Sequence, residues 1–212
     1  MQLVQGKVVL VTGASRGIGR AIANQFAQAG ANVAFTYLSS VEKGEALVNE
    51  LEAYGIKAKG YRSDASMFDA AEELVNSVVA DFGQIDVLIN NASSYYPTEI
   101  GNIHEEQWYD LMGSNLKAPL FLSQAAAIEL RKQQGCIINI TDMHVERPKK
   151  GYIVYSVAKA GLVTLTKSLA HELSPEVRVN AVAPGPVMWP EDNPQFDELY
   201  RQRVISQTLL KR

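Results

Sequence analysis

Residues 7–19 read Lys-Val-Val-Leu-Val-Thr-Gly-Ala-Ser-Arg-Gly-Ile-Gly, an apolar run that passes through a glycine-rich turn into a helical pattern. The apolar, β-branched run predicts a buried strand. Gly13, Gly17 and Gly19 allow a tight turn and a close approach of the backbone to a ligand. The first turn of the following helix offers unpaired N–H groups and the positive end of its dipole to a pyrophosphate. The stretch therefore predicts a dinucleotide-binding β-α-β unit at the start of the chain.

The rest of the chain repeats this alternation of short apolar runs and longer helical patterns. We expect strands at residues 7–12, 32–37, 57–62, 85–90, 136–141 and 178–183, and helices at 18–29, 42–54, 70–82, 155–173, within 107–134 and from about 196. Uninterrupted apolar strands between helices are typical of a parallel sheet that is covered on both faces. The sequence therefore predicts a doubly wound, Rossmann-like α/β fold, with residues 1–212 in a single domain.

Composition limits the classes of function. The chain has 212 residues, of which 47% are apolar and 20% charged, and its net charge of −3 gives no basic surface for nucleic acid. Cys136 is the only cysteine and the three histidines are scattered, so we expect no disulfide and no metal site. The chain shows no signal-peptide pattern and no apolar stretch long enough for a membrane span. These features predict a soluble cytoplasmic protein that acts on a small molecule, without nucleic-acid or membrane partners.

A second group of residues suggests proton chemistry. Tyr155 and Lys159 lie four residues apart in an expected helix, and therefore on one face of it. A lysine ammonium below a tyrosine hydroxyl favours the phenolate and would lower the tyrosine pKa toward neutrality. Asp142 follows the strand expected at 136–141 and could face the same cleft. The same spacing also occurs on ordinary helix surfaces, so the catalytic interpretation depends on the rest of the chain.

The end of the second expected strand bears on the choice between NAD and NADP. An NAD site usually has an acidic residue here for the adenine ribose, but residues 37–40 read Tyr-Leu-Ser-Ser, with no acid before Glu42. Arg16 in the glycine-rich turn could bind a 2′-phosphate, and Ser39 and Ser40 could donate to it. These residues predict NADP(H), although the two serines could also cap the next helix.

Two other expected strands end in polar residues that would face the same site. Asp64 follows the third strand, where it could accept from the adenine amino group; alternatively, Asp64 or Ser66 could cap the next helix. Asn91, Ala92 and Ser93 follow the fourth strand. Small and amide residues at this edge of a sheet suit a backbone that passes close to a ligand.

Taken together, these motifs resemble the short-chain dehydrogenase/reductase family. The matching motifs are Thr-Gly-x-x-x-Gly-x-Gly at 12–19, Asn-Asn-Ala at 90–92, Asn115, Tyr155-x-x-x-Lys159 and Asn-x-x-x-Pro-Gly at 180–185. The resemblance implies that Tyr155 is the proton donor, that Lys159 binds the nicotinamide ribose and lowers the Tyr155 pKa, and that Asn115 supports a proton-relay water. The expected cofactor-binding residues, with NADP(H) as the cofactor, are Gly13, Ser15, Arg16, Gly17, Ile18, Gly19, Tyr37, Leu38, Ser39, Ser40, Asp64, Ala65, Asn91, Ala92, Ser93, Tyr155, Lys159, Pro184, Gly185 and Val187.

Three features are similar to the pteridine reductases of that family. They are Asn-Ala-Ser-Ser-Tyr-Tyr-Pro-Thr at 91–98, Asn-Leu-Lys-Ala-Pro at 115–119, and Asp142 where most members have serine. The resemblance implies that Tyr95 stacks on a pterin ring and that Ser93 lies beside the cofactor. A flat heteroaromatic substrate suits such stacking, and a carboxyl group near a ring nitrogen can help to relay a proton through Tyr155.

We therefore expect an NADPH-dependent reductase of a pterin or dihydrofolate. The residues expected at the substrate are Ser93, Tyr95, Asp142 and Tyr155, and those expected in catalysis are Asp142, Tyr155, Lys159 and Asn115. The aromatic stretch at 95–97 could instead be a loop that is packed by its own rings.

Two other functions are compatible with the sequence. Gly17, where pteridine reductases carry arginine, and the stretch at 37–40 also fit a carbonyl reductase such as a 3-oxoacyl-thioester reductase. Asp142 fits that reaction less well, because a carboxylate repels a developing oxyanion unless it is protonated. The third alternative is an inactive NADP-binding sensor or scaffold.

The family resemblance also bears on the end of the chain and on assembly. Family members usually continue past the position of Arg212 with a helix, a strand and a glycine-rich tail. We therefore expect either a C-terminally truncated chain or a sheet that lacks its edge and part of the pocket floor. The family usually forms tetramers, with one interface on the two long helices expected within 107–134 and at 155–173, so we expect a homo-oligomer.

Overall fold

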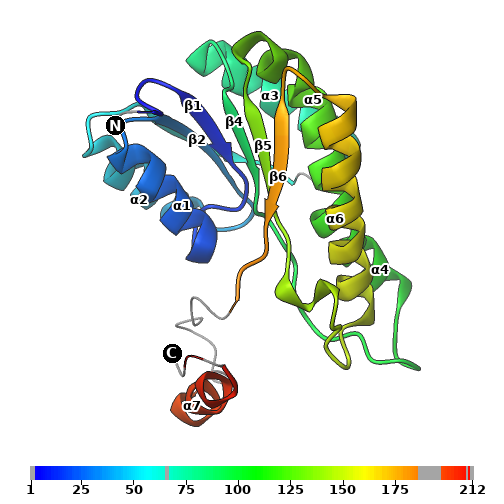
Figure 1. Ribbon diagram of the computed structural model, residues 1–212. Helices are drawn as coiled ribbons and strands as arrows, with labels where there is room; N and C mark the ends of the chain where they lie inside the picture. Colours follow the sequence, from blue (N-terminus) through cyan, green and yellow to red (C-terminus); the bar gives the residue numbers. More distant parts are fainter. Residues whose placement is uncertain (1–2, 65–66, 186–196, 209, 211–212) are drawn as a thin grey trace.

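The computed structural model describes residues 3–64, 67–185, 197–208 and 210. Its centre is a parallel six-stranded sheet with the strand order β3-β2-β1-β4-β5-β6 (Figure 1). The strands are β1 (Val8–Val11), β2 (Asn32–Tyr37), β3 (Ala58–Arg62), β4 (Val87–Asn90), β5 (Cys136–Ile140) and β6 (Arg178–Val182). The helices are α1 (Gly17–Gln28), α2 (Val41–Glu52), α3 (Phe68–Phe82), α4 (Glu105–Met112), α5 (Ala118–Gln133), α6 (Ile153–Glu172) and α7 (Glu198–Gln207). The predicted doubly wound α/β fold is confirmed.

The strand order reverses between β1 and β4, which is the switch point of the sheet. From β1 the chain moves outward through β2 and β3, then crosses to β4 and continues outward through β5 and β6. β1 and β4 are parallel neighbours that pair Val9 with Val87 and Val11 with Ile89. Their carboxyl ends therefore open side by side into the crevice where ligands bind in such sheets.

Helices cover the two faces of the sheet (Figure 1). On one face, Leu88 of β4 and Ile137 of β5 cluster with Leu122 of α5. On the other face, Phe35 of β2 clusters with Leu47 of α2. Every residue of β1 and β4 is buried, which explains why these strands read as continuous apolar runs instead of alternating patterns.

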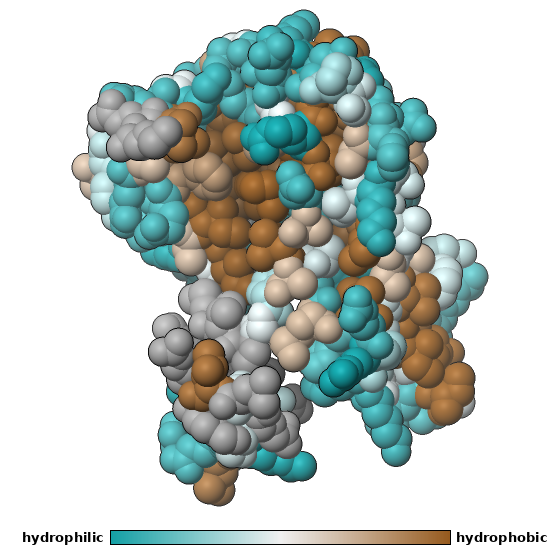
Figure 2. Space-filling view, in the orientation of Figure 1, coloured by the Kyte–Doolittle hydropathy of each residue, from teal (hydrophilic) through white to brown (hydrophobic). Residues whose placement is uncertain are grey.

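One part of the sheet is left open, on the α1 side over β5 and β6. Figure 2 shows an apolar surface there, in the middle of the view. An apolar hollow of about 380 Å³ in this region is lined by Ile18, Ile22, Phe26, Ile89, Ile138, Ile140, Val182 and Pro184. Val182, on the edge strand β6, is 51% exposed. The prediction of a sheet covered on both faces is wrong here, because no described helix crosses this face after β6; α7 lies below the sheet in Figure 1.

The long helix expected within 107–134 is present but not uniform. It begins at Glu105 as α4, passes through a π-helical turn at Gly113–Lys117 and continues as α5. Pro119 has no backbone N–H and cannot donate to the carbonyl of Asn115, four residues earlier, which favours the wider turn. Asn115 therefore lies in an irregular turn and not in a regular helix.

Two other helices differ slightly from expectation. The helix expected at 155–173 begins at Ile153, so Tyr155 lies in its first turn. The helix expected from about 196 begins at Glu198. Among the described helices, none combines the length and the apolar character needed to cross a membrane.

Asp86 joins the starts of three strands. Its carboxylate is buried and accepts from the Val8 amide at 2.8 Å, from the Gln84 side chain at 2.7 Å and from Lys7 Nζ at 2.8 Å. Its backbone also bonds to the backbones of Val8 and Cys136. The Val8 contact is buried whereas the Lys7 side chain is 44% exposed, so we expect the amide contact to contribute more to stability than the ion pair.

Asp86→Ala should lower the free energy of unfolding by about 1–3 kcal/mol, because the buried Val8 amide loses its side-chain partner. Lys7→Met should cost less than about 1 kcal/mol, since exposed ion pairs contribute little. Urea unfolding of the two variants measures the difference. Equal losses would mean that the ion pair, and not the buried amide contact, holds the strand starts together.

Candidate active site

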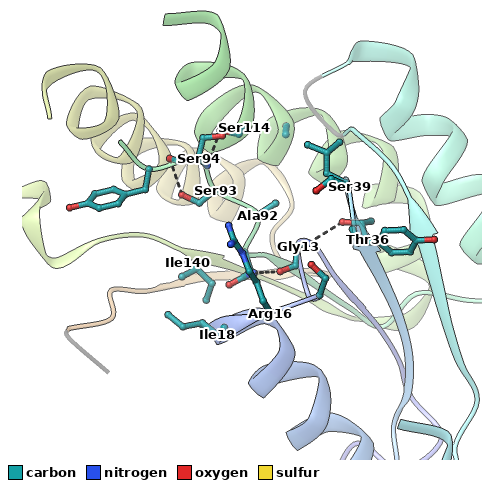
Figure 3. A pocket seen from close by; sticks show the side chains of 18 of the residues that line it. Gly13, Arg16, Ile18, Thr36, Ser39, Ala92, Ser93, Ser94, Ser114 and Ile140 are labelled. Carbon is teal, nitrogen blue, oxygen red and sulfur yellow. Dashed lines mark hydrogen bonds between the residues drawn. The ribbon is translucent and has the colours of Figure 1, made fainter. Parts of the chain in front are cut away.

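A cavity of about 750 Å³ opens at the carboxyl ends of the central strands, at the switch point of the sheet. Figure 3 shows Gly13 near its centre, with Thr36 and Ser39 to one side and Ser93, Ser94 and Ser114 at the far end. The predicted site residues that line it are Gly13, Ser15, Arg16, Gly17, Ile18, Gly19, Tyr37, Leu38, Ser39, Ser40, Asp64, Asn91, Ala92, Ser93, Tyr95, Asp142, Tyr155, Lys159, Pro184 and Gly185. Asn115 is buried next to the cavity, and the predicted residues Ala65 and Val187 lie outside the described residues.

The glycine-rich turn brings the backbone of β1 against that of β4. Gly13 has a φ of +65°, and a Cβ at this position would lie only 2.9 Å from the Cα of Ala92. A Cβ at Gly19 would lie 2.5 Å from the Gly13 carbonyl oxygen. The Gly13 amide donates to the Thr36 hydroxyl at 3.0 Å, which ties the turn to β2 (Figure 3). These contacts leave room for hydrogen atoms only, so the turn requires glycine.

Asn91 and Thr12 lock the ends of β4 and β1 together. The Asn91 side chain donates to the Thr12 carbonyl at 2.8 Å and to the Gly13 carbonyl at 3.2 Å. The Thr12 hydroxyl accepts from the backbone amides of Asn91 and Ala92, both at 2.9 Å. Asn91 therefore fixes the shape of the crevice, in addition to any contact that it makes with a ligand.

The corner of the cavity beside β2 combines cations and hydroxyl groups. Ser40 is the residue before α2, but its side chain makes no capping hydrogen bond, so the structure gives no support to the capping alternative for this serine. Lys43, in the first turn of α2, also lines the cavity, together with Arg16 and Ser39. Lys43 is not among the predicted site residues; its position three residues after Ser40, in the first turn of a helix, was the available signal.

The residue before α3 is Met67, so Asp64 does not occupy the N-cap position, and the Met67 amide bonds to the backbone carbonyl of Asp64. Ser66, the other predicted cap, lies outside the described residues. Asp64 lines the cavity, so a contact with the adenine amino group stays a prediction.

Arg16→Ala and Lys43→Ala should each weaken NADPH binding more than NADH binding. A charge-assisted bond to a 2′-phosphate contributes about 1.5–3 kcal/mol, so the preference for NADPH should fall by at least about tenfold. Arg20→Ala is the matched control, because Arg20 lies in the first turns of α1, close to Arg16 in sequence, but its side chain pairs with Glu50. Fluorescence titration of both cofactors measures the preference, and an unchanged ratio in both test variants would place the phosphate elsewhere.

Asp142, Tyr155 and Lys159 meet at the other end of the cavity. The Tyr155 hydroxyl donates to Asp142 Oδ2 at 2.7 Å, and Asp142 Oδ1 accepts from the His144 amide at 2.7 Å. Lys159 Nζ donates to the backbone carbonyl of Ile140 at 2.8 Å. Tyr155 and Lys159 are almost completely buried, at 8% and 3% exposure. The predicted grouping of the three residues is therefore present.

The electrostatic consequence differs from the prediction. Burial raises the pKa of Tyr155, and the hydrogen bond to Asp142 and its negative charge raise that pKa further. The expected lowering of the Tyr155 pKa by Lys159 is wrong, because the ammonium bonds to the Ile140 carbonyl and lies 5.8 Å from the centre of the Tyr155 ring. Burial lowers the pKa of Lys159 to about 8, although the negative charge of Asp142 opposes this effect. In this geometry Tyr155 is a protonated hydroxyl, suited to donation.

Lys159→Met should remove a pH dependence of stability. The pKa of Lys159 is about 8 in the folded protein, against about 10.4 in an unfolded chain. Between these values the unfolded chain binds more protons than the folded one, so the free energy of unfolding of the wild type rises with pH. The rise is at most about 1.4 kcal/mol per pH unit. Urea unfolding between about pH 8 and about pH 10 tests this; the same slope in the variant would contradict the lowered pKa.

Asn115 holds the loop that follows β4. Its side-chain oxygen accepts from the Ser93 hydroxyl at 2.7 Å, and its amide donates to the carbonyls of Ser94 and Leu111, both at 3.0 Å. The irregular turn at Gly113–Lys117 places this amide against the loop. Asn115 therefore positions Ser93 and Ser94, and its support of a relay water stays a prediction.

Tyrosine rings form the wall beside Tyr155. Tyr95 stacks on Tyr152 with ring centres 4.8 Å apart and an interplanar angle of 17°. It also meets Tyr155 edge to face, again at 4.8 Å. The predicted place of Tyr95 beside the reacting group is therefore present, and one face of its ring is taken by Tyr152. Tyr152 is not among the predicted site residues, and its position three residues before Tyr155 was the available signal.

Comparison with known proteins places the chain in a family. Residues 7–197 match the short chain dehydrogenase family. A curated relative, the 3-oxoacyl-[acyl-carrier-protein] reductase FabG of Staphylococcus epidermidis, is 38% identical over 208 residues, which cover 97% of this chain and 85% of the relative. The chain belongs to the short-chain dehydrogenase/reductase family.

Solved structures agree with this assignment. A blue fluorescent protein from a metagenomic library, in complex with NADPH, has a TM-score of 0.88 and 34% identity, over 95% of this chain and 82% of that one. A metagenomic short-chain oxidoreductase in complex with NADP has a TM-score of 0.81 and 38% identity, over 86% of this chain and 83% of that one. The predicted homo-oligomer and cytoplasmic location are not tested by these likenesses and stay predictions.

Proposed function

We propose that the chain is an NADPH-dependent reductase that adds a hydride and a proton to a polarised double bond of a small molecule. The family membership supports an oxidoreductase. Two solved relatives contain NADPH or NADP, which supports the choice of cofactor. The protonated Tyr155 beside Asp142 supports the direction of reduction.

The residues of the glycine-rich turn fit a dinucleotide. A Cβ at Gly17 would have no atom within 4 Å, so the turn is open at this point, and the first turn of α1 directs backbone N–H groups toward it. Arg16, Ser39 and Lys43 are positioned for the 2′-phosphate, and Lys159 for the nicotinamide ribose. When bound, NADPH would supply the hydride.

Tyr155 and Asp142 handle the proton. Tyr155 holds its proton at neutral pH and can give it to a basic atom of the substrate that replaces Asp142 as the hydrogen-bond acceptor. Asp142 is only partly buried, so it can take a proton from solvent and return it to Tyr155 across the 2.7 Å contact.

The substrate class that this arrangement fits best is a pterin or dihydrofolate, and the contact between Tyr155 and Asp142 carries that conclusion. Reduction of a ring C=N bond requires a proton at nitrogen, and a carboxyl group that exchanges protons with Tyr155 suits that need. Tyr95 lines the cavity beside Tyr155 and is 46% exposed, and an exposed aromatic ring at this place suits a heteroaromatic substrate.

A 3-oxoacyl thioester is the second candidate, and the curated relative named above supports it better than it supports a pterin. The carbonyl oxygen of such a substrate gains negative charge and needs neutral or positive donors. Asp142 lies beside Tyr155, where its carboxylate accepts a hydrogen bond from the Tyr155 hydroxyl and has no hydrogen to donate to the substrate oxygen. For this candidate Asp142 has to be protonated during the reaction.

Tyr155→Phe should reduce kcat by at least about a hundredfold with any substrate, because it removes the proton donor and little volume. NADPH affinity should change little, so binding serves as the control for folding. Loss of NADPH absorbance with dihydrobiopterin, with acetoacetyl thioester and with neither measures turnover. A variant that keeps more than about a tenth of the wild-type kcat would remove Tyr155 from the donor role.

Asp142→Ser distinguishes the two substrate classes. It should lower pterin turnover by at least about tenfold, because the carboxyl group leaves the relay. With acetoacetyl thioester it should raise turnover, since a neutral hydroxyl donor replaces a negative charge. A gain with the thioester and no loss with the pterin would overturn the pterin assignment in favour of the second candidate.

A further inference from the structure

Lys149 places a positive charge at the aromatic wall of the active site. Its Nζ donates to the Tyr95 hydroxyl at 3.1 Å and lies 4.4 Å from the centre of the Tyr152 ring. Tyr95 in turn contacts Tyr155 edge to face. The ammonium is therefore one aromatic ring away from the proton donor, on the loop that leads into α6.

This cation has no anionic partner among the described residues. The four ion pairs of the described chain use Lys7, Arg20, Lys59 and Lys132. Burial lowers the pKa of Lys149, but the hydrogen bond to Tyr95 and the neighbouring tyrosines outweigh it, so the pKa lies above its ordinary value and the group stays charged. An ammonium has three N–H donors, and Tyr95 takes one of them.

The surroundings add to the positive potential. Arg147 and Lys150 lie on the same exposed loop, and Gly151 separates this loop from Tyr152. Glu146 is three residues before Lys149 in sequence, and the Glu99 side chain lies beside Gly151. Neither carboxylate forms an ion pair with Lys149 in the described part of the chain. A cation over a tyrosine face contributes only modestly by itself. A bond from Lys149 to an anion would also use the two N–H groups of the ammonium that do not donate to Tyr95.

We infer that Lys149 binds an anionic group of the substrate that lies beyond the reacting ring. This inference rests on the proposed reductase and names its substrate class more closely. In the pterin series, the substrate favoured is one of the dihydrofolate type, whose tail ends in carboxylates, over a pterin with a neutral side chain. Lys149 is thus a specificity-determining residue, separate from the proton relay.

The test compares paired substrates that differ in charge. Wild type, Lys149→Met and Lys149→Arg are assayed for kcat and KM with dihydrofolate and with dihydrobiopterin, and Lys150→Met is the matched control. The ratio of kcat/KM for dihydrofolate to that for dihydrobiopterin should fall about tenfold in Lys149→Met, mainly through KM. Lys149→Arg and Lys150→Met should keep most of the wild-type ratio.

Two readouts separate anion binding from support of Tyr95. Added salt should raise the wild-type KM for dihydrofolate more than that for dihydrobiopterin, and Lys149→Met should lose this difference. Tyr95→Phe keeps the ring but removes the acceptor of the Lys149 bond. If Tyr95→Phe reproduces the change in ratio, or if Lys149→Met affects both substrates equally, Lys149 only supports Tyr95 and the inference is overturned.

Failure of the pterin assignment gives a different result. If only acetoacetyl thioesters are reduced, the charged coenzyme A thioester and the neutral N-acetylcysteamine thioester replace the pterin pair. The same fall in ratio in Lys149→Met then supports an anion site for phosphate. If no substrate is reduced, folate is titrated into the wild type and into Lys149→Met in the presence of NADP. A weaker affinity of the variant for folate supports the inference, and equal affinities overturn it.

Discussion

The hydrogen bond from the Tyr155 hydroxyl to Asp142 constrains the whole reaction end of the molecule. It joins the loop after β5 to the first turn of α6, and the His144 amide fixes the second carboxylate oxygen. Burial raises the pKa of Tyr155, and the hydrogen bond to Asp142 and its negative charge raise that pKa further; the same charge opposes the lowering of the Lys159 pKa by burial. With serine in place of Asp142, the same backbone would hold a tyrosine with a different proton affinity. The chemistry of the site therefore depends on this pair more than on the fold around it.

Much of the molecule could be predicted because parallel strands share one edge. Residues that follow consecutive strands must meet at that edge, whatever their separation in the chain. Arg16 after β1, Ser39 after β2 and Asn91 after β4 accordingly line one cavity. Asp142 and Tyr155, thirteen residues apart, also meet as expected. These predictions needed only the order of strands and helices and the residue types at their ends.

Other features could not be predicted because they depend on depth and on contacts between distant segments. A four-residue spacing puts Tyr155 and Lys159 on one face, but it says nothing of their burial or of the Ile140 carbonyl that takes the ammonium. For that reason the sequence predicts a lowered Tyr155 pKa, whereas burial and Asp142 raise it. Lys149 reaches Tyr95 across 54 positions in sequence, and no local pattern indicates that contact. The open face over β5 and β6 likewise depends on which helices cross the sheet.

Similarity to known proteins identifies the family of this chain, whereas the chemistry of the site bears on its substrate. Identity of 38% is an average over 97% of this chain, most of which forms the sheet and its helices. A few side chains line the opposite end of the cavity, among them Tyr95 and Asp142, and Lys149 contacts Tyr95. Changes at these positions hardly affect the overall identity, yet we expect them to influence whether a carbonyl oxygen or a ring nitrogen receives the proton. The family can therefore be assigned from the whole chain, whereas the substrate has to be argued from this wall of the cavity.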